Sequence, residues 1–157
     1  MDNKVVQTLA RACVLSGYRS VRFNFRGVGG SAGAWDEGRG ELDDALAVVR
    51  TFRAVDQPLV LAGFSFGAYV AARAAAQLTA LSKLVLVGPA ASRFDLPEVP
   101  ANTLVIHGED DEVVPLVAAL QWARPQSLPV VVLPGVGHFF HGQLPLLKAL
   151  VMGALRA

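Results

Sequence analysis

The chain has 157 residues, of which 53% are hydrophobic and 17% charged, and it carries a net charge of +1. This length fits a single domain over residues 1–157, and the near-neutral charge without a basic run argues against nucleic acid as a partner. No apolar stretch reaches the ~18 residues of a membrane-spanning helix, and no signal-peptide core lies near Met1, so we expect no membrane partner and a cytoplasmic location.

Helical and strand patterns alternate along the chain. An amphipathic helix is predicted over residues 3–16, and Cys13, the lone cysteine, is expected to be a buried thiol on its apolar face in a reducing compartment. An alternating pattern predicts a strand from Arg19 to Phe25. Further helices are predicted over residues 42–52, 66–79, 114–123 and from Pro145 onward, and further strands over residues 59–62, 84–87, 103–106 and 130–133. This alternation predicts an α/β fold, a mostly parallel sheet with helices on both faces.

A glycine-rich loop, Arg26 to Ser31, follows the first predicted strand. Its glycines do not have the spacing of a dinucleotide-binding loop, and no helix starts directly after it. We therefore expect a structural loop beside the rim of the active site, and no cofactor.

The most informative segment runs from Leu59 to Gly67 and reads as an apolar strand ending in Gly-x-Ser-x-Gly, followed at once by a helix-forming run. This context is typical of a nucleophile elbow, in which Ser65 would sit on a strained turn with its hydroxyl above the sheet. A Cβ at Gly63 or Gly67 is expected to collide with the neighbouring strand or helix. The helix N-terminus would favour the anion formed when the serine attacks a carbonyl. The alternative is an ordinary Gly/Ser turn.

Four acids follow the predicted strand at 103–106, namely Glu109, Asp110, Asp111 and Glu112. The carboxyl ends of parallel strands share one edge of the sheet, so these acids are expected near Ser65. One of them can accept the Nδ1–H of a histidine and fix its tautomer. The alternatives are a solvated acidic loop and a Mg²⁺ or Ca²⁺ loop. No second cluster of oxygen ligands accompanies the acids, so we expect no metal.

The three histidines differ in their position relative to the strands. His138 ends a glycine-rich turn just after the strand at 130–133, where an imidazole can swing over the neighbouring strand ends. His141 begins the next turn and resembles a capping residue, and His107 is expected to be structural because its strand end already supplies the acid. The resulting order of serine, acid and histidine is the one that accompanies the elbow in this fold.

Four segments together resemble the alpha/beta-hydrolase superfamily, and among its members the small bacterial hydrolases of dienelactone-hydrolase-like type. They are F-x-F-R-G-x-G-x-S from Phe23 to Ser31, G-F-S-F-G from Gly63 to Gly67, H-G-x-x-D-x-x-V-P from His107 to Pro115, and G-x-x-H-F-F from Gly135 to Phe140. The resemblance covers nearly the whole chain, and the ordered set is more specific than any single motif.

The resemblance implies a catalytic triad with Ser65 as the nucleophile and His138 as the base. The H-G-x-x-D pattern selects Asp111 rather than Asp110 as the acid. The backbone N–H of Phe66 would be one donor of the oxyanion hole.

The chain departs from the family pattern at its N-terminus. The relatives carry further strands before the helix that begins here, and the last of these ends in a loop that supplies the second oxyanion N–H. Its strand lies between those that match residues 19–25 and 59–63. We therefore expect a domain that is incomplete at the N-terminus, in which these two strands leave a gap or pair directly. Exposed apolar edges would lower stability and promote self-association.

Larger relatives insert a lid between the segments that match 84–87 and 103–106, where this chain has only a short loop. Arg93 and Asp95 of this loop are placed to line the rim. We therefore expect an open site without a lid domain, suited to small or accessible esters.

The leading hypothesis is a serine hydrolase that cleaves a small-molecule ester, thioester or lactone through an acyl-enzyme on Ser65. An acyltransferase would use the same residues. The alternative from another class is a weak or inactive fragment, or a binding module, that keeps the motifs but lacks the oxyanion loop.

Overall fold

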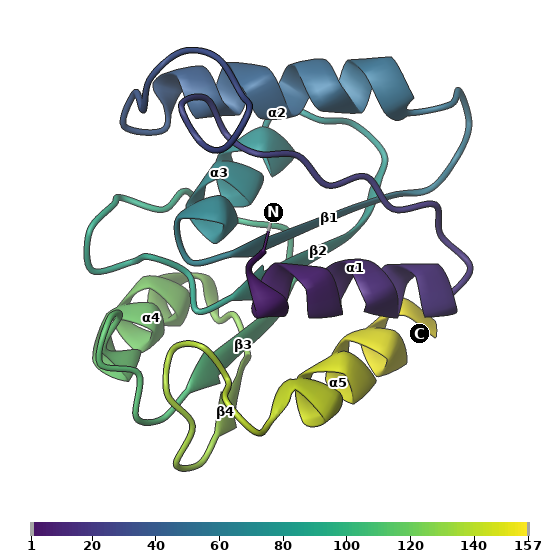
Figure 1. The fold of residues 1–157 in the computed structure, drawn as a ribbon. Helices are drawn as coiled ribbons and strands as arrows, with labels where there is room; N and C mark the ends of the chain where they lie inside the picture. Colours follow the sequence, from purple (N-terminus) through teal and green to yellow (C-terminus); the bar gives the residue numbers. More distant parts are fainter. Residues whose placement is uncertain (1, 157) are drawn as a thin grey trace.

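The computed structural model describes residues 2–156, in which helices cover both faces of a four-stranded parallel sheet (Figure 1). In chain order the elements are α1 (Lys4–Leu15), α2 (Arg39–Phe52), β1 (Leu59–Phe64), α3 (Phe66–Ala75), β2 (Leu81–Val87), β3 (Leu104–Gly108), α4 (Leu116–Ala123), the short 3₁₀ helix η1 (Arg124–Gln126), β4 (Val130–Leu133) and α5 (Leu144–Arg156). The strand order is β1-β2-β3-β4, and every pair is parallel. The predicted α/β fold class is confirmed.

The alternation of side chains along β2 separates the core into two layers. Val85 and Val87 pack against α1 and α5 on one face, whereas Leu84 and Leu86 pack against α3 and α4 on the other. All four side chains are fully buried. Successive residues of a strand point to opposite faces, so a strand covered on both sides is continuously apolar.

Small side chains bring α3 close to the sheet. Its inward face consists of alanines (Ala68, Ala71, Ala72 and Ala75), and these pack directly on β2. On the opposite face α1 and α5 lie side by side, the purple and yellow helices of Figure 1. Burial raises the pKa of the Cys13 thiol on α1, which fits its expected place in the core.

Helix α3 ends at Ala75, four residues before its predicted end. Two helices begin at other residues than predicted, for local reasons. Helix α2 begins at Arg39, three residues earlier than predicted, because the buried Glu41 carboxylate accepts the N–H groups of Asp36 and Gly38 and so satisfies the helix entry. Helix α4 begins at Leu116 rather than Val114, because a residue before proline avoids the helical conformation.

The strand predicted from Arg19 to Phe25 is wrong, since this segment has no regular secondary structure. It runs within the long connection between α1 and α2 (Figure 1), with Val21 and Phe23 exposed. A strand needs a neighbour that pairs with its backbone N–H and C=O groups. Within the described residues, β1 pairs only with β2, so the segment and β1 do not pair directly.

The edge position of β1 also changes its burial. Its first three residues are half-buried and Ala62 is exposed, although the sequence predicts a buried strand. Separately, no helix within residues 2–156 is long and apolar enough to cross a membrane.

Candidate active site

Ser65 occupies the sharp turn between β1 and α3. Its backbone has φ of +54° and ψ of −118°, a conformation that is strained for a residue with a side chain. The Ser65 N–H donates to the carbonyl oxygen of Val87 at 2.9 Å, which ties the turn to the end of β2. Phe66 is the first residue of α3, so its N–H has no acceptor within the helix and is available to an anion beside Ser65.

The two glycines of the turn have different surroundings. A Cβ at Gly63 would lie 2.2 Å from the carbonyl oxygen of Gly67, so only glycine permits this approach of β1 and α3. The expected collision at Gly67 is wrong, because a Cβ there would meet only the Phe25 ring at 3.8 Å, an ordinary van der Waals contact. No strand lies beside β1 on this side within the described residues, which leaves the space open.

The structure joins Ser65, His138 and Asp111 in one chain of hydrogen bonds. His138 Nε2 lies 3.0 Å from Ser65 Oγ, and its Nδ1 lies 2.6 Å from Asp111 Oδ2. The carboxylate can only accept, so Nδ1 carries the proton of the neutral imidazole and Nε2 is free to accept from the serine hydroxyl. This arrangement can move a proton away from Ser65 when the serine attacks an electrophile.

The Asp111 carboxylate is held by its own loop. Its Oδ1 accepts the backbone N–H groups of Val113 at 2.9 Å and Val114 at 2.7 Å. The side chain is fully buried, and that of His138 is almost fully buried. Both carboxylate oxygens are therefore occupied, and the carboxylate has a single orientation toward the imidazole.

Gly88, which sequence reasoning missed, allows the imidazole to approach the sheet. It follows β2 with φ of +51°, and a Cβ there would lie 3.3 Å from His138 Cε1 and 3.4 Å from Nδ1. The signal in the sequence was a glycine directly after a buried strand, at the edge where the other site residues lie.

The remaining acids and His141 lie outside the hydrogen-bonded chain. Asp110 and His141 are exposed, and Glu109 accepts the Gly135 N–H at 2.9 Å. Among the neighbouring acids and histidines, Asp111 and His138 are thus the pair that face each other. Asp110, Glu109 and His141 face solvent or the loop backbone.

His107 lies buried beneath the site, in keeping with its expected structural position. Its Nε2 lies 2.8 Å from the carbonyl oxygen of Val114 and 3.4 Å from Asp111 Oδ2, and its Nδ1 has no hydrogen-bond partner among the described residues. A carbonyl accepts only, so Nε2 carries the proton. Burial lowers the pKa of His107, which keeps the ring neutral.

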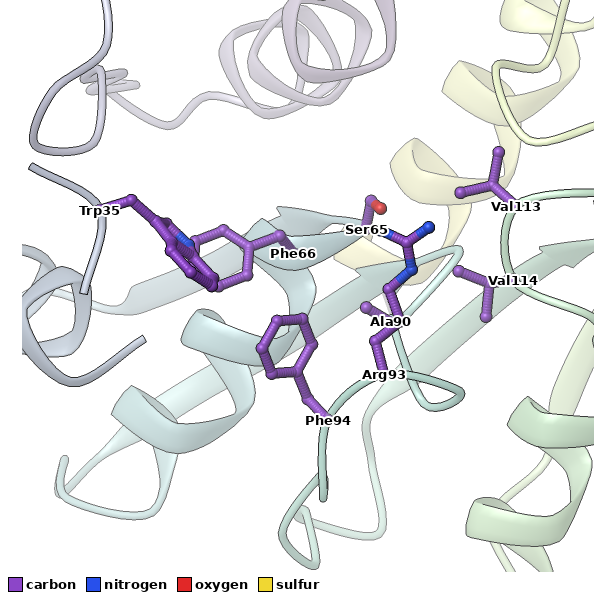
Figure 2. Close-up of a pocket in the computed structure, with 8 residues that line it drawn as sticks. All are labelled: Trp35, Ser65, Phe66, Ala90, Arg93, Phe94, Val113 and Val114. Atoms are coloured by element: carbon purple, nitrogen blue, oxygen red, sulfur yellow. The ribbon is translucent and has the colours of Figure 1, made fainter. Parts of the chain in front are cut away.

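An open cavity of about 270 Å³ lies in front of Ser65 (Figure 2). Three kinds of side chain line it: the aromatic Trp35, Phe66 and Phe94; the aliphatic Ala90, Val113 and Val114; and the polar Ser65 and Arg93. Arg93 lines the cavity as expected, but Asp95 lines a separate cavity beside it. Sequence reasoning missed Trp35 and Phe94, whose aromatic side chains in loop segments were the available signal.

The glycine-rich loop is anchored by its own side chains. The Arg26 guanidinium forms two hydrogen bonds of 2.8 Å with the Asp44 carboxylate, and this pairing lowers the pKa of that carboxyl. A Cβ at Gly40 would collide with the same guanidinium. Among the residues that the structure describes, no cluster of three or more His, Cys, Asp or Glu side chains is arranged to hold a metal ion.

Comparison with known proteins places the chain in a family. The model of the alpha/beta hydrolase fold family matches residues 2–102. A lidless alpha/beta serine hydrolase from Xanthomonas campestris is 45% identical, with a TM-score of 0.92, over 99% of this chain and 74% of its own. An alpha/beta serine hydrolase homologue from Coxiella burnetii is 41% identical, with a TM-score of 0.85, over 98% of this chain and 76% of its own.

A sequence relative is an uncharacterized protein of Rickettsia prowazekii. It is 32% identical over 123 residues, which are 73% of this chain and 52% of the Rickettsia protein. The match thus spans about half of that relative's length. On the evidence of the family model, these relatives and the fold, the chain belongs to the alpha/beta-hydrolase family.

Proposed function

We propose that this chain is a serine hydrolase that cleaves a small-molecule ester, thioester or lactone through an acyl-enzyme on Ser65. The observation that carries the proposal is the hydrogen-bonded chain from Ser65 through His138 to Asp111, beside a cavity open to solvent. Its family membership supports the same class of reaction.

In the first half-reaction, Ser65 Oγ attacks the carbonyl carbon of the substrate while His138 Nε2 takes the hydroxyl proton. The tetrahedral intermediate then expels the alcohol or thiol, which receives that proton from Nε2. In the second half, water attacks the acyl-enzyme in the same way, releases the acid and restores Ser65. Asp111 stabilises the imidazolium that forms in each half.

The substrate oxygen becomes negatively charged in both intermediates, close to the N-terminus of α3. The Phe66 N–H is the donor that the described residues supply there. Removing one donor of an oxyanion hole costs about 10²–10³ in kcat in other enzymes. The proposed activity is therefore weak in this 157-residue chain.

Hydrolysis is favoured over acyl transfer to another acceptor by the exposure of the site. Ser65 is half-buried, and the segment between β2 and β3 forms no helix that covers it. Water can therefore reach the acyl-enzyme directly.

The test combines covalent labelling with turnover. A fluorophosphonate should label the wild-type chain on Ser65, and Ser65→Ala should abolish labelling and lower p-nitrophenyl acetate hydrolysis at least ~10³-fold. The control is Ser92→Ala, a serine on the neighbouring cavity, which should change neither result. Unchanged turnover in Ser65→Ala would refute the mechanism. A folded wild-type chain without labelling or turnover would favour the binding-module alternative.

A further inference from the structure

We propose that Arg93 makes this site selective for esters that carry a carboxylate near the scissile bond. The inference rests on the proposed hydrolase function and adds the charge of its substrate. It begins from a cation that shares the cavity of the nucleophile and has no acidic partner among residues 2–156.

Arg93 comes from the loop after β2, and its side chain extends into the cavity in front of Ser65 (Figure 2). The loop turns tightly here, since the Arg93 N–H donates to the carbonyl oxygen of Ala90 at 3.1 Å. Ala90 is itself buried and lines the same cavity. The base of the Arg93 side chain is therefore fixed relative to the end of β2, to which Ser65 is also bonded.

The Arg93 guanidinium has neither an ion pair nor a side-chain hydrogen bond within the described part of the chain. In contrast, Arg26 pairs with Asp44, and Arg39 pairs with Asp36. Other arginines without a partner, such as Arg50 on α2, lie on the open surface. Arg93 is exposed as well, but it differs from these because it lines the cavity of the candidate nucleophile.

The rest of the cavity favours an anion at this cation. None of the described residues that line it is acidic, and apart from Ser65 and Arg93 they are aromatic or aliphatic, including Trp35 and Phe94. Because Arg93 is exposed, water competes for its guanidinium, and a single charge pair there adds about 1 kcal/mol or less, a factor of about five in affinity. A guanidinium can bind a carboxylate through two parallel hydrogen bonds, a geometry that also fixes the ligand's orientation.

The carboxylate can lie on the acyl part or on the leaving group of the ester, so the experiment has two arms. In the acyl arm, the p-nitrophenyl ester of 4-carboxybenzoic acid is compared with that of 4-carbamoylbenzoic acid. In the leaving-group arm, 4-acetoxybenzoate is compared with 4-acetoxybenzamide. Each pair keeps the size of the substrate and changes its charge. Each enzymatic rate is divided by the rate of alkaline hydrolysis of the same ester, because the carbamoyl group withdraws electrons more strongly than the carboxylate. The rigid ring prevents the carboxylate from attacking its own ester.

We expect the wild-type chain to prefer the anionic member of at least one pair by about two- to fivefold in kcat/KM. Arg93→Gln should remove this preference through a higher KM, because the contact is made to substrate and transition state alike. Arg93→Lys should restore part of it. The surface variant Arg50→Gln should behave as wild type on all four esters, whereas Arg93→Gln should lose more activity on the anionic member of the pair than on the neutral one.

Three results would overturn the proposal. One is an equal rate on both members of each pair, and another is a preference that survives in Arg93→Gln. The third is a loss in Arg93→Gln that is equal for neutral and anionic esters, which would place the guanidinium at the developing oxyanion instead.

A binding measurement separates this inference from the hydrolase proposal itself. The measurement uses the Ser65→Ala chain and follows the shift of its NMR signals as each ligand is added. The anion 4-carbamoylbenzoate should bind more tightly than the neutral terephthalamide. Adding Arg93→Gln should abolish this difference in affinity. If no ester is hydrolysed but this difference holds, the hydrolase proposal fails and the anion site remains. If esters are hydrolysed but neither arm nor the binding shows the difference, the anion site fails alone.

Discussion

A single residue step separates Asp111 from Asp110, and the two side chains have opposite surroundings. Asp111 is enclosed by two backbone N–H groups and the imidazole of His138. Asp110 is exposed. This contrast makes the pair a direct test of which acid orients the histidine.

Asp111→Asn should lower kcat by about 10³–10⁴-fold. The amide oxygen can still accept from Val113 and Val114, but the amide NH₂ then faces His138 and favours the wrong tautomer. His138→Ala should cost a similar factor. The controls Asp110→Asn and His141→Ala should stay within about threefold of wild type in a p-nitrophenyl acetate assay. The opposite ranking would show that the acid and base are misassigned.

His107 predicts a dependence of stability on pH. Above pH ~6.5 the ring is neutral in both the folded and the unfolded chain. Below that pH, His107 binds a proton in the unfolded chain but not in the folded chain, because burial lowers the pKa of His107 in the folded state. Stability is therefore lost as the pH falls from about 6.5 toward the lowered pKa, by at most ~1.4 kcal/mol per pH unit.

His107→Gln provides the comparison for this loss, since its amide can still donate to the carbonyl oxygen of Val114 but does not titrate. Urea unfolding at pH 7.5, 6.5 and 5.5 should show a smaller loss of unfolding free energy in the variant than in wild type. Asp111 and His138, which face the same ring, are present in both proteins, so the difference between the two pH profiles reports on His107. Parallel pH profiles would contradict the assignment.

Among the secondary-structure elements, β1 and α3 make the closest approach that affects the site. The methyl group of Gly63→Ala would collide with the backbone carbonyl of Gly67. Overpacking of this kind destabilises a folded protein by about 1–3 kcal/mol or more. Gly67→Ala adds the same methyl group at an ordinary van der Waals distance from the Phe25 ring, within the first turn of α3, where alanine favours the helix. We expect Gly63→Ala to lower the melting temperature and the labelling of Ser65, and Gly67→Ala to leave both near wild type. A similar loss in both variants would show that Gly67 is also constrained.

The elements that the sequence predicted well carry their signal locally. The buried strands and the amphipathic helices were found from periodicity and turn residues within a short window. The segment from Arg19 to Phe25 has the same alternation, yet it forms no strand, because pairing depends on a neighbour that a local pattern does not report.

The residues of the candidate site likewise divide into those that a local motif predicts and those that depend on distant parts of the chain. Ser65, Asp111 and His138 lie in recognisable motifs, and the structure brings them together. Gly88 could not be assigned, because its role depends on an imidazole that arrives from a loop fifty residues later in the chain. Trp35 was missed for the same reason, since the cavity it lines is assembled from separate loops.

In the whole molecule, β1 lies at an edge of the sheet with its outer backbone groups unpaired by other described strands. Val21 and Phe23 are exposed on the neighbouring connection. Unpaired edges and exposed apolar side chains favour association between copies. We therefore propose that the 157-residue chain self-associates.

Adding an N-terminal strand that ends in a glycine-rich loop should raise the melting temperature, reduce self-association and increase esterase turnover. The strand would pair with β1, and the loop would add a second oxyanion donor, worth about 2.7–4 kcal/mol of transition-state stabilisation. Thermal melts, analytical ultracentrifugation and p-nitrophenyl acetate assays on the two chains would test this. A short chain that is already monomeric, cooperative in its melt and fully active would contradict it.

The spatial order of the strands is also their order of synthesis. Each new strand pairs with the one made just before it, so the sheet can grow by one strand and one helical crossover at a time as the chain leaves the ribosome. The turn that holds Ser65 is complete early in this sequence, whereas His138 follows the last strand. The nascent chain thus contains Ser65 long before His138, and the hydrogen bond between them can form only after the last described strand has been made.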